Sequence, residues 1–300
     1  MLLDTPSLYF RAFFGVPESV TAPDGTPVNA VRGLLDMIAR LVRERSPHSL
    51  VACMDADWRP KFRVDALPSY KAHRVGPDGG DQTPPALAAQ VPVIEEVLDA
   101  FGVARVGAPG YEADDVIGTL ATAEDGEVDV VTGDRDLFQL VRDDKPVRVL
   151  YTARGIKALQ IIDEAEVTAK YGIPGRAYAD FATLRGDPSD GLPGVPGVGD
   201  KTAAALISRF GSLDAIDRAL GEDQTSGFPT GSRLKLEKAR DYLGTAEKVV
   251  RVVTDIPLPS FDARVPRTPR TPGRLVELTD QWNLDGPVNR LLGAMSATGD

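Results

Sequence analysis

The stretch from residue 103 to residue 136 reads VARVGAPGYEADDVIGTLATAEDGEVDVVTGDRD, and it decides the fold. Two short apolar runs, 103–106 and 128–131, enclose a helical pattern over 116–123. A strand, a helix and a second strand in this order form the repeating unit of a parallel sheet. The pattern therefore predicts an α/β fold.

The same alternation continues on both sides of this stretch. Further apolar runs cover 1–3, 50–54 and 147–150, and helical spacing is present over 31–42 and 87–101. After about residue 175 strand signals nearly vanish, and short helical patterns follow at 178–184, 201–210, 213–220, 234–243 and 246–253. We therefore expect a parallel-sheet domain over 1–175 and an α-helical module over 176–256.

The last part of the chain is rich in proline from residue 257 onward. Proline favours an extended path along the surface, and a last short helix is predicted over 287–295. Residues 257–300 are thus expected to be a C-terminal extension that packs on the surface. The first strand candidate is very short, which leaves open whether a few residues precede it.

Composition limits the class of protein. Of 300 residues 42% are hydrophobic, which is enough for a large buried core. No apolar run approaches the ~20 residues that cross a bilayer, and the first residues form no export leader. The single cysteine excludes disulfides within the chain. We expect a cytoplasmic protein that does not bind membranes.

A net charge of −10 argues at first against a nucleic-acid partner. Total charge hides local arrangement, however. If the acidic residues that follow the strands gather around bound cations, the rest of the chain is close to neutral. DNA binding is then compatible with the acidic balance, provided that basic side chains flank the acidic centre.

Carboxylates follow four of the predicted strands at the point where each strand ends. The carboxyl ends of parallel strands lie at one edge of a sheet, so these side chains should meet there. They are Asp4, Asp55, Glu112, Asp114, Asp115, Asp134 and Asp136. Carboxylates in close proximity repel one another, so such a cluster calls for cations.

A structural role is the alternative for some of these acids. Glu112, Asp114 and Asp115 precede or open a helix, where anions are favoured, and for this triplet alone the two interpretations weigh equally. Asp134 has the position of a turn residue after Gly133. The repetition at successive strand ends favours metal binding.

The ligand types indicate the cation. The chain has two histidines and one cysteine, none in a metal-binding spacing, which disfavours zinc and copper. Oxygen ligands suit Mg²⁺ or Mn²⁺. Two such ions about 4 Å apart can activate a water molecule and clamp a phosphodiester, and no histidine base is then needed.

The segment from Gly194 to Thr202 reads GVPGVGDKT. Glycines such as Gly197 and Gly199 leave backbone amides unobstructed, and Lys201 opens a helical run. Amides at such a helix start form an anion site, which suits one phosphate of a duplex without reading its sequence. A plain Gly-Pro turn would leave Lys201 unexplained. Asp187 and Asp190 lie just upstream, where the module can deliver them to the acidic cluster.

Basic and aromatic side chains alternate between residues 58 and 74, WRPKFRVDALPSYKAHR. This combination attracts phosphate and offers faces on which bases stack. The residues concerned are Lys61, Phe62, Arg63, Tyr70, Lys71 and Arg74, to which Arg11 can be added. A solvated basic face is the ordinary alternative, but the position beside Asp55 favours a substrate role.

Taken together, these residues resemble the bacterial 5′ nuclease family of flap endonucleases and the 5′ exonuclease domain of DNA polymerase I, here in a stand-alone form. The resemblance covers about residues 1–256. Its strongest motifs are YEADDVIGTLA (111–121), TGDRDLFQL (132–140) and GDPSDGLPGVPGVGDKTA (186–203). FRVDALPSYKAHR matches the family's arch-entry motif, and LYFRAF its first-strand motif.

The resemblance implies a PIN-like (resolvase-like) catalytic domain with an arch over about 61–86, followed by a helix-three-turn-helix module that binds duplex DNA. It implies a structure-specific 5′-3′ exonuclease and flap endonuclease that uses two or three metal ions, in replication primer removal and DNA repair. The substrate would be DNA with a 5′ flap or 5′ end, or an RNA–DNA hybrid.

The resemblance also assigns residues to roles. One metal group would be Asp4, Asp55, Glu112, Asp114 and Asp115, and the second Asp134, Asp136, Asp187 and Asp190. Lys71 and Arg74 would steady the scissile phosphate as catalytic cations. Gly197, Val198, Gly199, Lys201 and Thr202 would grip the duplex, and the carbonyls of Val195 and Val198 would bind K⁺.

Two features depart from the family pattern. Thr5 and Pro6 follow Asp4, where the family usually has a glycine, so the turn after the first acid is in question. No polymerase domain and no evident sliding-clamp peptide follow the helical module, and we expect a monomer.

Two other functions stay open at this stage. One is a non-catalytic DNA-binding protein whose acids only shape the fold; such a protein would be indifferent to EDTA. The other is a PIN-type ribonuclease or RNase H that acts on RNA or on a hybrid.

Overall fold

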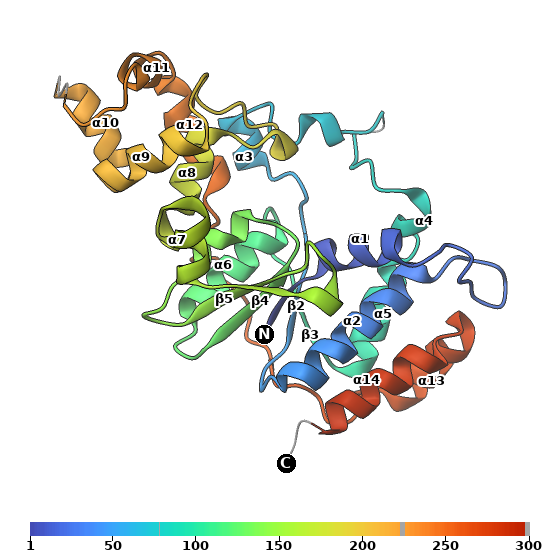
Figure 1. The fold of residues 1–300 in the computed structure, drawn as a ribbon. Coiled ribbons are helices and arrows are strands. Elements are labelled where there is room, and N and C mark those ends of the chain that lie inside the picture. Colours follow the sequence, from blue (N-terminus) through green and yellow to red (C-terminus); the bar gives the residue numbers. More distant parts are fainter. Residues whose placement is uncertain (78, 223–225, 298–300) are drawn as a thin grey trace.

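A six-stranded sheet forms the centre of the computed structural model, which describes residues 1–77, 79–222 and 226–297 (Figure 1). Its strand order is β3-β2-β1-β4-β5-β6, and all neighbours are parallel except β6, which runs antiparallel to β5. The strands are β1 (Leu2–Asp4), β2 (Val51–Cys53), β3 (Ala104–Val106), β4 (Val128–Thr132), β5 (Val147–Tyr151) and β6 (Gln160–Ile162). The predicted α/β class is confirmed.

Neighbouring residues of each central strand point into different cores. Leu2 and Val130 belong to one hydrophobic cluster, whereas Leu3 and Val131 belong to the other. Side chains alternate across a strand, so a continuous apolar run can cover both faces of a sheet. This is why the strands read as short apolar blocks and not as alternating ones.

Helices cover both faces of the sheet. The helices of the Leu3 face are α1 (Thr5–Gly15), α2 (Asn29–Arg45), α4 (Pro85–Ala88), α5 (Val91–Phe101), α13 (Pro272–Trp282) and α14 (Asp285–Ala297). Those of the Leu2 face are α6 (Ala113–Ala123), η2 (Asp136–Leu140), α7 (Glu164–Tyr171), η4 (Gly175–Ala177) and α8 (Tyr178–Arg185).

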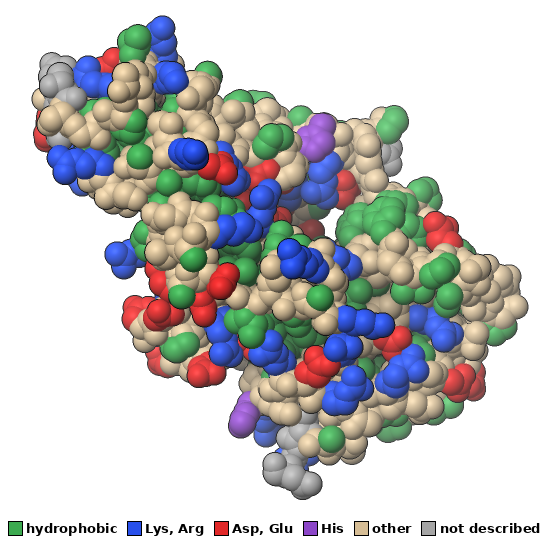
Figure 2. All heavy atoms as spheres, in the orientation of Figure 1, with side chains coloured by type: hydrophobic (Ala, Val, Ile, Leu, Met, Phe, Trp, Pro, Cys, Tyr) green, Lys and Arg blue, Asp and Glu red, His purple; other side chains and the backbone are tan. Residues whose placement is uncertain are grey.

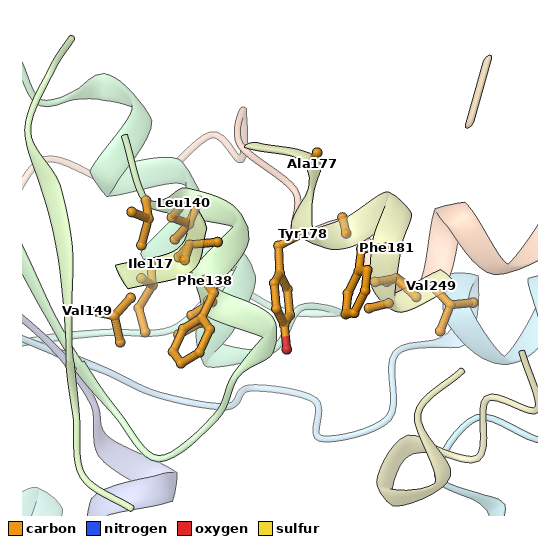
Figure 3. Packing of buried hydrophobic residues seen from close by; sticks show 14 of the residues in the cluster. Ile117, Phe138, Leu140, Val149, Ala177, Tyr178, Phe181 and Val249 are labelled. Carbon is orange, nitrogen blue, oxygen red and sulfur yellow. The ribbon is translucent and has the colours of Figure 1, made fainter. Parts of the chain in front are cut away.

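The helical module continues from α8 without a break in the core. It contains α9 (Asp200–Phe210), α10 (Leu213–Gly221), α11 (Ser232–Lys238) and α12 (Arg240–Val250). Figure 3 shows Phe138 of η2, Tyr178 and Phe181 of α8 and Val249 of α12 in one apolar layer. The Phe138 and Tyr178 rings meet edge to face, with centroids 5.4 Å apart. The module is therefore packed firmly on the sheet domain.

Helix breaks were predicted wrongly at two places. Residues 87–101 form two helices, because the chain breaks near Gln90, whose side-chain oxygen accepts from the amides of Ala30 and Val31 at the start of α2. In the module the break lies at Ala239 and not at Gly244, which stays inside α12. An exposed helix position tolerates glycine at a cost of only about 1 kcal/mol.

Several elements were not predicted: helices α1, α3 (Lys61–Ala66), α7 and α13, and strand β6. Strand β6 lies at the sheet edge, and Ile161 is exposed there, so the strand carries no clear apolar signal. Helix α13 starts with Pro272 and Gly273, which suggest a turn, but proline also suits the first turn of a helix.

The C-terminal helices cover the outer side of α2 and α5. Leu275, Leu278, Leu284 and Leu291 are buried there. Figure 1 shows α13 and α14 beside α2 and α5, away from the helical module. Within the described residues, no helix is both long and apolar enough to pass through a membrane.

Candidate active site

A cleft of about 1830 Å³ lies at the carboxyl edge of the sheet. Its walls come from α1, α2, the strand ends and the segment that joins α3 (Lys61–Ala66) to α4. In Figure 1 this segment, light blue to teal, runs from beside the helical module toward α1. Figure 2 shows this face hollowed between the module and the sheet domain, with acidic side chains inside and basic ones around them. Residue 78 of the segment lies outside the described residues.

The structure brings most of the predicted acids to this cleft. Those that line it are Asp4, Asp55, Glu112, Asp114, Asp134 and Asp187. Asp136 and Asp190 adjoin them, since each is close enough to Asp134 and Asp187 for mutual repulsion to affect its pKa. Asp4 and Asp187 therefore line one cleft, and Asp136 lies close to Asp187.

Asp4 stands at the exact junction between β1 and α1. One carboxylate oxygen accepts from the backbone of Ser7 at 3.1 Å, and the other from the hydroxyl of Thr132 at the end of β4. Pro6 lies in the first helical turn, where a missing amide is harmless, so Thr5 and Pro6 start a helix without disturbing the acid. Burial, with Asp55 and Asp134 nearby, raises the pKa of Asp4 to about 7.

Asp55 and Asp114 lie on the other side of Asp4. Asp55 accepts from the amide of Ala113 at 2.8 Å, which joins the end of β2 to the start of α6. Solvent reaches Asp55, but the surrounding protein removes part of its hydration. This desolvation raises the pKa of Asp55 to about 6. Burial and the charges of Asp4 and Asp134 raise the pKa of Asp114 well above its usual range.

A second group of acids follows β4 and helix α8. Asp134 accepts from the amide of Asp136, and so it is a turn residue as well as a cleft residue. Burial and neighbouring acids raise the pKa of Asp136, and its Oδ1 is buried without a hydrogen-bond partner among the described residues. Asp187 caps η5 (Pro188–Asp190), and burial raises the pKa of Asp190 to about 6.

Asp115 does not reach the cleft, which corrects its prediction as a metal ligand. It is fully buried, and both of its oxygens bind the guanidinium of Arg63, at 2.6 and 2.7 Å. It also accepts from the amide of Glu112, three residues earlier, as in a capping box. Asp115 therefore has the structural role, capping the start of α6, that is the alternative to metal binding.

Arg63 and Tyr70 were predicted to contact DNA, and their burial corrects this. Arg63 is 2% exposed and Tyr70 is 3% exposed. The Arg63 guanidinium and the Tyr70 hydroxyl both donate to one oxygen of Glu112, at 2.8 and 2.7 Å. A basic and aromatic run thus supplies partners for buried acids, because unpaired charges are costly to bury.

Lys71 and Arg74 do line the cleft. The Lys71 ammonium forms an ion pair with the second oxygen of Glu112, and Arg74 pairs with Asp81 at 3.1 Å. The Arg74 guanidinium also lies over the ring of Trp58, 5.5 Å from its centroid. The backbone of Lys71 donates to the carbonyl of Asp190, which ties the basic stretch to the second acid group.

The other predicted DNA contacts fall into two groups. Arg11 lines the cleft, and its Nε is buried with no partner in the described part of the chain. Lys61 is exposed on α3 and pairs with Asp65, and Phe62 lies beside Tyr111 with ring centroids 5.9 Å apart. Neither Lys61 nor Phe62 lines the cleft.

The glycine-rich hairpin, residues 194–202, has a turn followed by the start of α9, as its glycines predict. Val198 donates to the carbonyl of Val195 at 2.9 Å, and Gly197 has φ +76°, which a turn with Pro196 before it requires. Gly199 caps α9, so the amides of the first helical turn face outward next to Lys201 and Thr202. The side chains of Val195 and Val198 are buried, and Lys235 donates to the carbonyl of Gly197 at 2.9 Å.

The donor set suits hard divalent cations. Carboxylates with raised pKa values and a buried oxygen without a partner are stabilised by a nearby positive ion. Nevertheless, among the residues that the structure describes, no three such side chains already stand close enough to hold one ion in common. Glu112 in particular is held by Arg63, Tyr70 and Lys71.

Sequence reasoning missed several residues that build this site. Thr132 binds Asp4 and also accepts from the amide of Asp134, and its place at a strand end next to GDRD is a usable signal. Gln139 and Lys235 bind backbone carbonyls far away in sequence, and no spacing could indicate that.

Two family models match the chain. The first, 5′-3′ exonuclease N-terminal resolvase-like domain, matches residues 1–172. The second, 5′-3′ exonuclease C-terminal SAM fold, matches residues 173–271.

Similar proteins agree with these models. A 5′-3′ exonuclease of Streptomyces coelicolor is 57% identical over 303 residues, which cover 99% of this chain and 100% of the relative. DNA polymerase I of Mycobacterium bovis is 39% identical over all of this chain, which spans 32% of that protein. The flap endonuclease of bacteriophage T5, solved with DNA and metal ions, has a TM-score of 0.63 at 17% identity and covers 100% of this chain and 99% of that one. At this identity the last likeness concerns the fold alone.

Proposed function

The chain belongs to the 5′-3′ exonuclease family and is a 5′ nuclease, and from this premise we propose that the acidic cleft hydrolyses phosphodiesters in DNA that carries a 5′ flap or a 5′ end. The observation that carries the proposal is the gathering of acids from separate strand ends and from the start of η5 into one cleft. A protein that only bound phosphate would gain nothing from this concentration of negative charge.

Mg²⁺ or Mn²⁺ fits this set of carboxylate oxygens. Asp4, Asp55, Glu112 and Asp114 would hold one group of ions, and Asp134, Asp136, Asp187 and Asp190 a second. Two such ions supply Lewis acidity for attack by water and for departure of the leaving oxygen. The number of ions and the choice between the two metals are predictions.

The basic and aromatic side chains of the cleft have complementary roles. Lys71 and Arg74 lie at the acidic centre, so they can neutralise the phosphate that must enter it. Trp58, under the Arg74 guanidinium, offers a face to a base of the same strand. These contacts hold the strand without reading its sequence.

The hairpin would hold the duplex next to the cut. Outward amides at the start of α9, with Lys201 beside them, suit a backbone phosphate. The expected K⁺ at the carbonyls of Val195 and Val198 stays a prediction. So do action on RNA–DNA hybrids, the roles in primer removal and repair, the monomeric state and the cytoplasmic location.

A labelled flap substrate tests the proposal. With Mg²⁺ or Mn²⁺ we expect short 5′ products released near the junction with duplex, and with EDTA we expect none. A flap left whole at every metal concentration, with DNA still bound, would favour the non-catalytic binding protein. Cleavage of RNA or hybrid in preference to DNA would favour the ribonuclease.

A further inference from the structure

Helix α12 connects the glycine-rich hairpin, through Tyr242 near its start, with both groups of acids, through its end. We propose that α12, with its C-terminal end and exit at Val249–Val253, sets the register between duplex and cleft, with Arg63 and Gln139 as positioning residues. This inference rests on the proposed function, because it concerns where a bound strand is cut.

Arg63 ties the end of α12 to the first acid group. Its Nε donates to the carbonyl of Val249 at 2.9 Å, and its remaining nitrogens hold Asp115 and Glu112. The carbonyls of a last helical turn lack partners within the helix and favour a cation, so an arginine fork fits there. Asp115 in turn accepts from the amide of Val253 at 2.9 Å.

Gln139 ties the same segment to the second acid group. Its amide nitrogen donates to the carbonyl of Asp136 at 2.8 Å and to that of Val250 at 3.0 Å. Its amide oxygen accepts from the backbone of Val252 at 3.1 Å. One neutral side chain therefore joins the exit of α12 to η2, which begins with Asp136.

Tyr242 ties α12 to the hairpin. Its hydroxyl accepts from the amide of Gly194 at 3.1 Å and donates to the carbonyl of Thr183 on α8 at 3.1 Å. Tyr242 and Val249 are two helical turns apart, about 10 Å along the axis. Val249 is buried in the layer with Phe181, so the helix cannot shift freely (Figure 3).

These contacts make α12 a rigid spacer. The hairpin fixes a phosphate of the duplex, and the acids act on a phosphate some nucleotides away. The distance between the two sites selects the bond that is cut. A displacement of about 1 Å at reacting atoms can cost about 100-fold in rate.

Gln139→Leu and Tyr242→Phe test this, because both are uncharged changes that leave the proposed metal ligands in place. Gln160→Leu on β6 and Tyr171→Phe are matched controls; within the described residues the Tyr171 hydroxyl is buried without a hydrogen-bond partner. Arg63→Lys is a third variant, which keeps the charge but loses the fork.

Each protein is assayed on one flap substrate under single turnover, with product lengths resolved to the nucleotide. DNA affinity in EDTA, Mn²⁺ binding without DNA and thermal unfolding are measured alongside. For the test variants we expect DNA affinity within about twofold of wild type, a rate lower by about 10- to 100-fold and cuts spread over neighbouring bonds. The controls should cut like wild type.

Two outcomes overturn the inference. One is wild-type rate and a single cut position in Gln139→Leu and Tyr242→Phe. The other is a lower rate at an unchanged single position, which indicates a merely structural role. If Arg63→Lys does not fold, the two uncharged variants decide alone. A wild-type protein that cuts nowhere overturns the proposed function, and this inference with it.

Discussion

At the scale of single residues, the acids in and near the cleft differ in the hydrogen-bond partners that they have. Asp115 has its oxygens filled by Arg63 and backbone amides, whereas one oxygen of Asp136 is buried with no partner in the described structure. A buried acceptor without a partner costs free energy unless a ligand supplies one. Asp136 is therefore a better candidate ligand than Asp115, although both follow the same family pattern.

Asp136→Asn and Asp187→Asn should each reduce single-turnover cleavage by at least about 100-fold, because each removes a charge that would face the cations. DNA affinity in EDTA should stay near the wild-type value. Asp217→Asn, at an exposed ion pair with Arg240, is the matched control. Wild-type turnover in either cleft variant would remove that residue from the site.

The acids with raised pKa values also predict how stability depends on pH. The pKa of Asp4 is about 7 and those of Asp55 and Asp190 are about 6, all above their values in an unfolded chain. The folded protein thus binds more protons between about pH 4 and pH 7, so the stability that these groups contribute is lost progressively as pH rises from about 4 to 7. Without metal, the melting temperature should be lower at pH 8 than at pH 5.5.

Divalent ions should reverse this loss. Added Mn²⁺ should raise the melting temperature more at pH 8, where the acids are ionised, than at pH 5.5. Calorimetry of the EDTA-treated protein at both pH values, with and without Mn²⁺, measures both effects. Equal Mn²⁺ stabilisation at the two pH values would contradict a site built from these acids.

At the scale of elements, a helix start serves two purposes in this chain. The start of α6 is capped by its own acids and also presents Asp114 to the cleft, and the start of α9 presents amides beside Lys201. Both arrangements use the positive end of a helix, but only the second leaves it open to an anion. The glycines before α9 account for the difference.

Lys201→Met should weaken binding of duplex-containing substrates about equally for all sequences. The slope of log affinity against log salt should become less steep by about 1, as for one lost phosphate contact. Lys145→Met, at an exposed ion pair with Asp125, serves as control. An unchanged slope would place the duplex elsewhere on the module. The assay is a salt series of fluorescence anisotropy measurements in EDTA.

At the scale of the whole molecule, the C-terminal helices are part of the fold and not an appendage. Leu275, Leu278, Leu284 and Leu291 are at most 3% exposed against α2 and α5. Each such side chain contributes about 1.5–3 kcal/mol. Together they approach the whole net stability of an ordinary domain, about 5–15 kcal/mol.

A chain cut after Ile256 should therefore lack a stable fold, and the milder Leu291→Ala should lower the free energy of unfolding by about 2–5 kcal/mol. Denaturant unfolding followed by circular dichroism measures both. Val276→Ala, at an exposed position of α13, should stay within about 0.5 kcal/mol of wild type. A truncated chain that unfolds cooperatively at the wild-type midpoint would show that the extension is dispensable.

Much of this protein could be predicted from its sequence, because the decisive signals are local. Apolar blocks predicted five of the six strands, and acids directly after them could be assigned to one sheet edge, since parallel strands end together. Glycines before Lys201 predicted an open helix start, and the motifs indicated the family. In each case neighbours in the chain are neighbours in space.

Tertiary structure alone decided how charges are partnered. The sequence presents Arg63 and Lys71 as members of one basic run, but the fold buries Arg63 among Asp115, Glu112 and the carbonyl of Val249, and leaves Lys71 at the cleft. The same holds for Gln139, which bonds Val250 and Val252, both more than 100 residues away. Burial and long-range hydrogen bonds depend on how elements pack, and no local pattern encodes that packing.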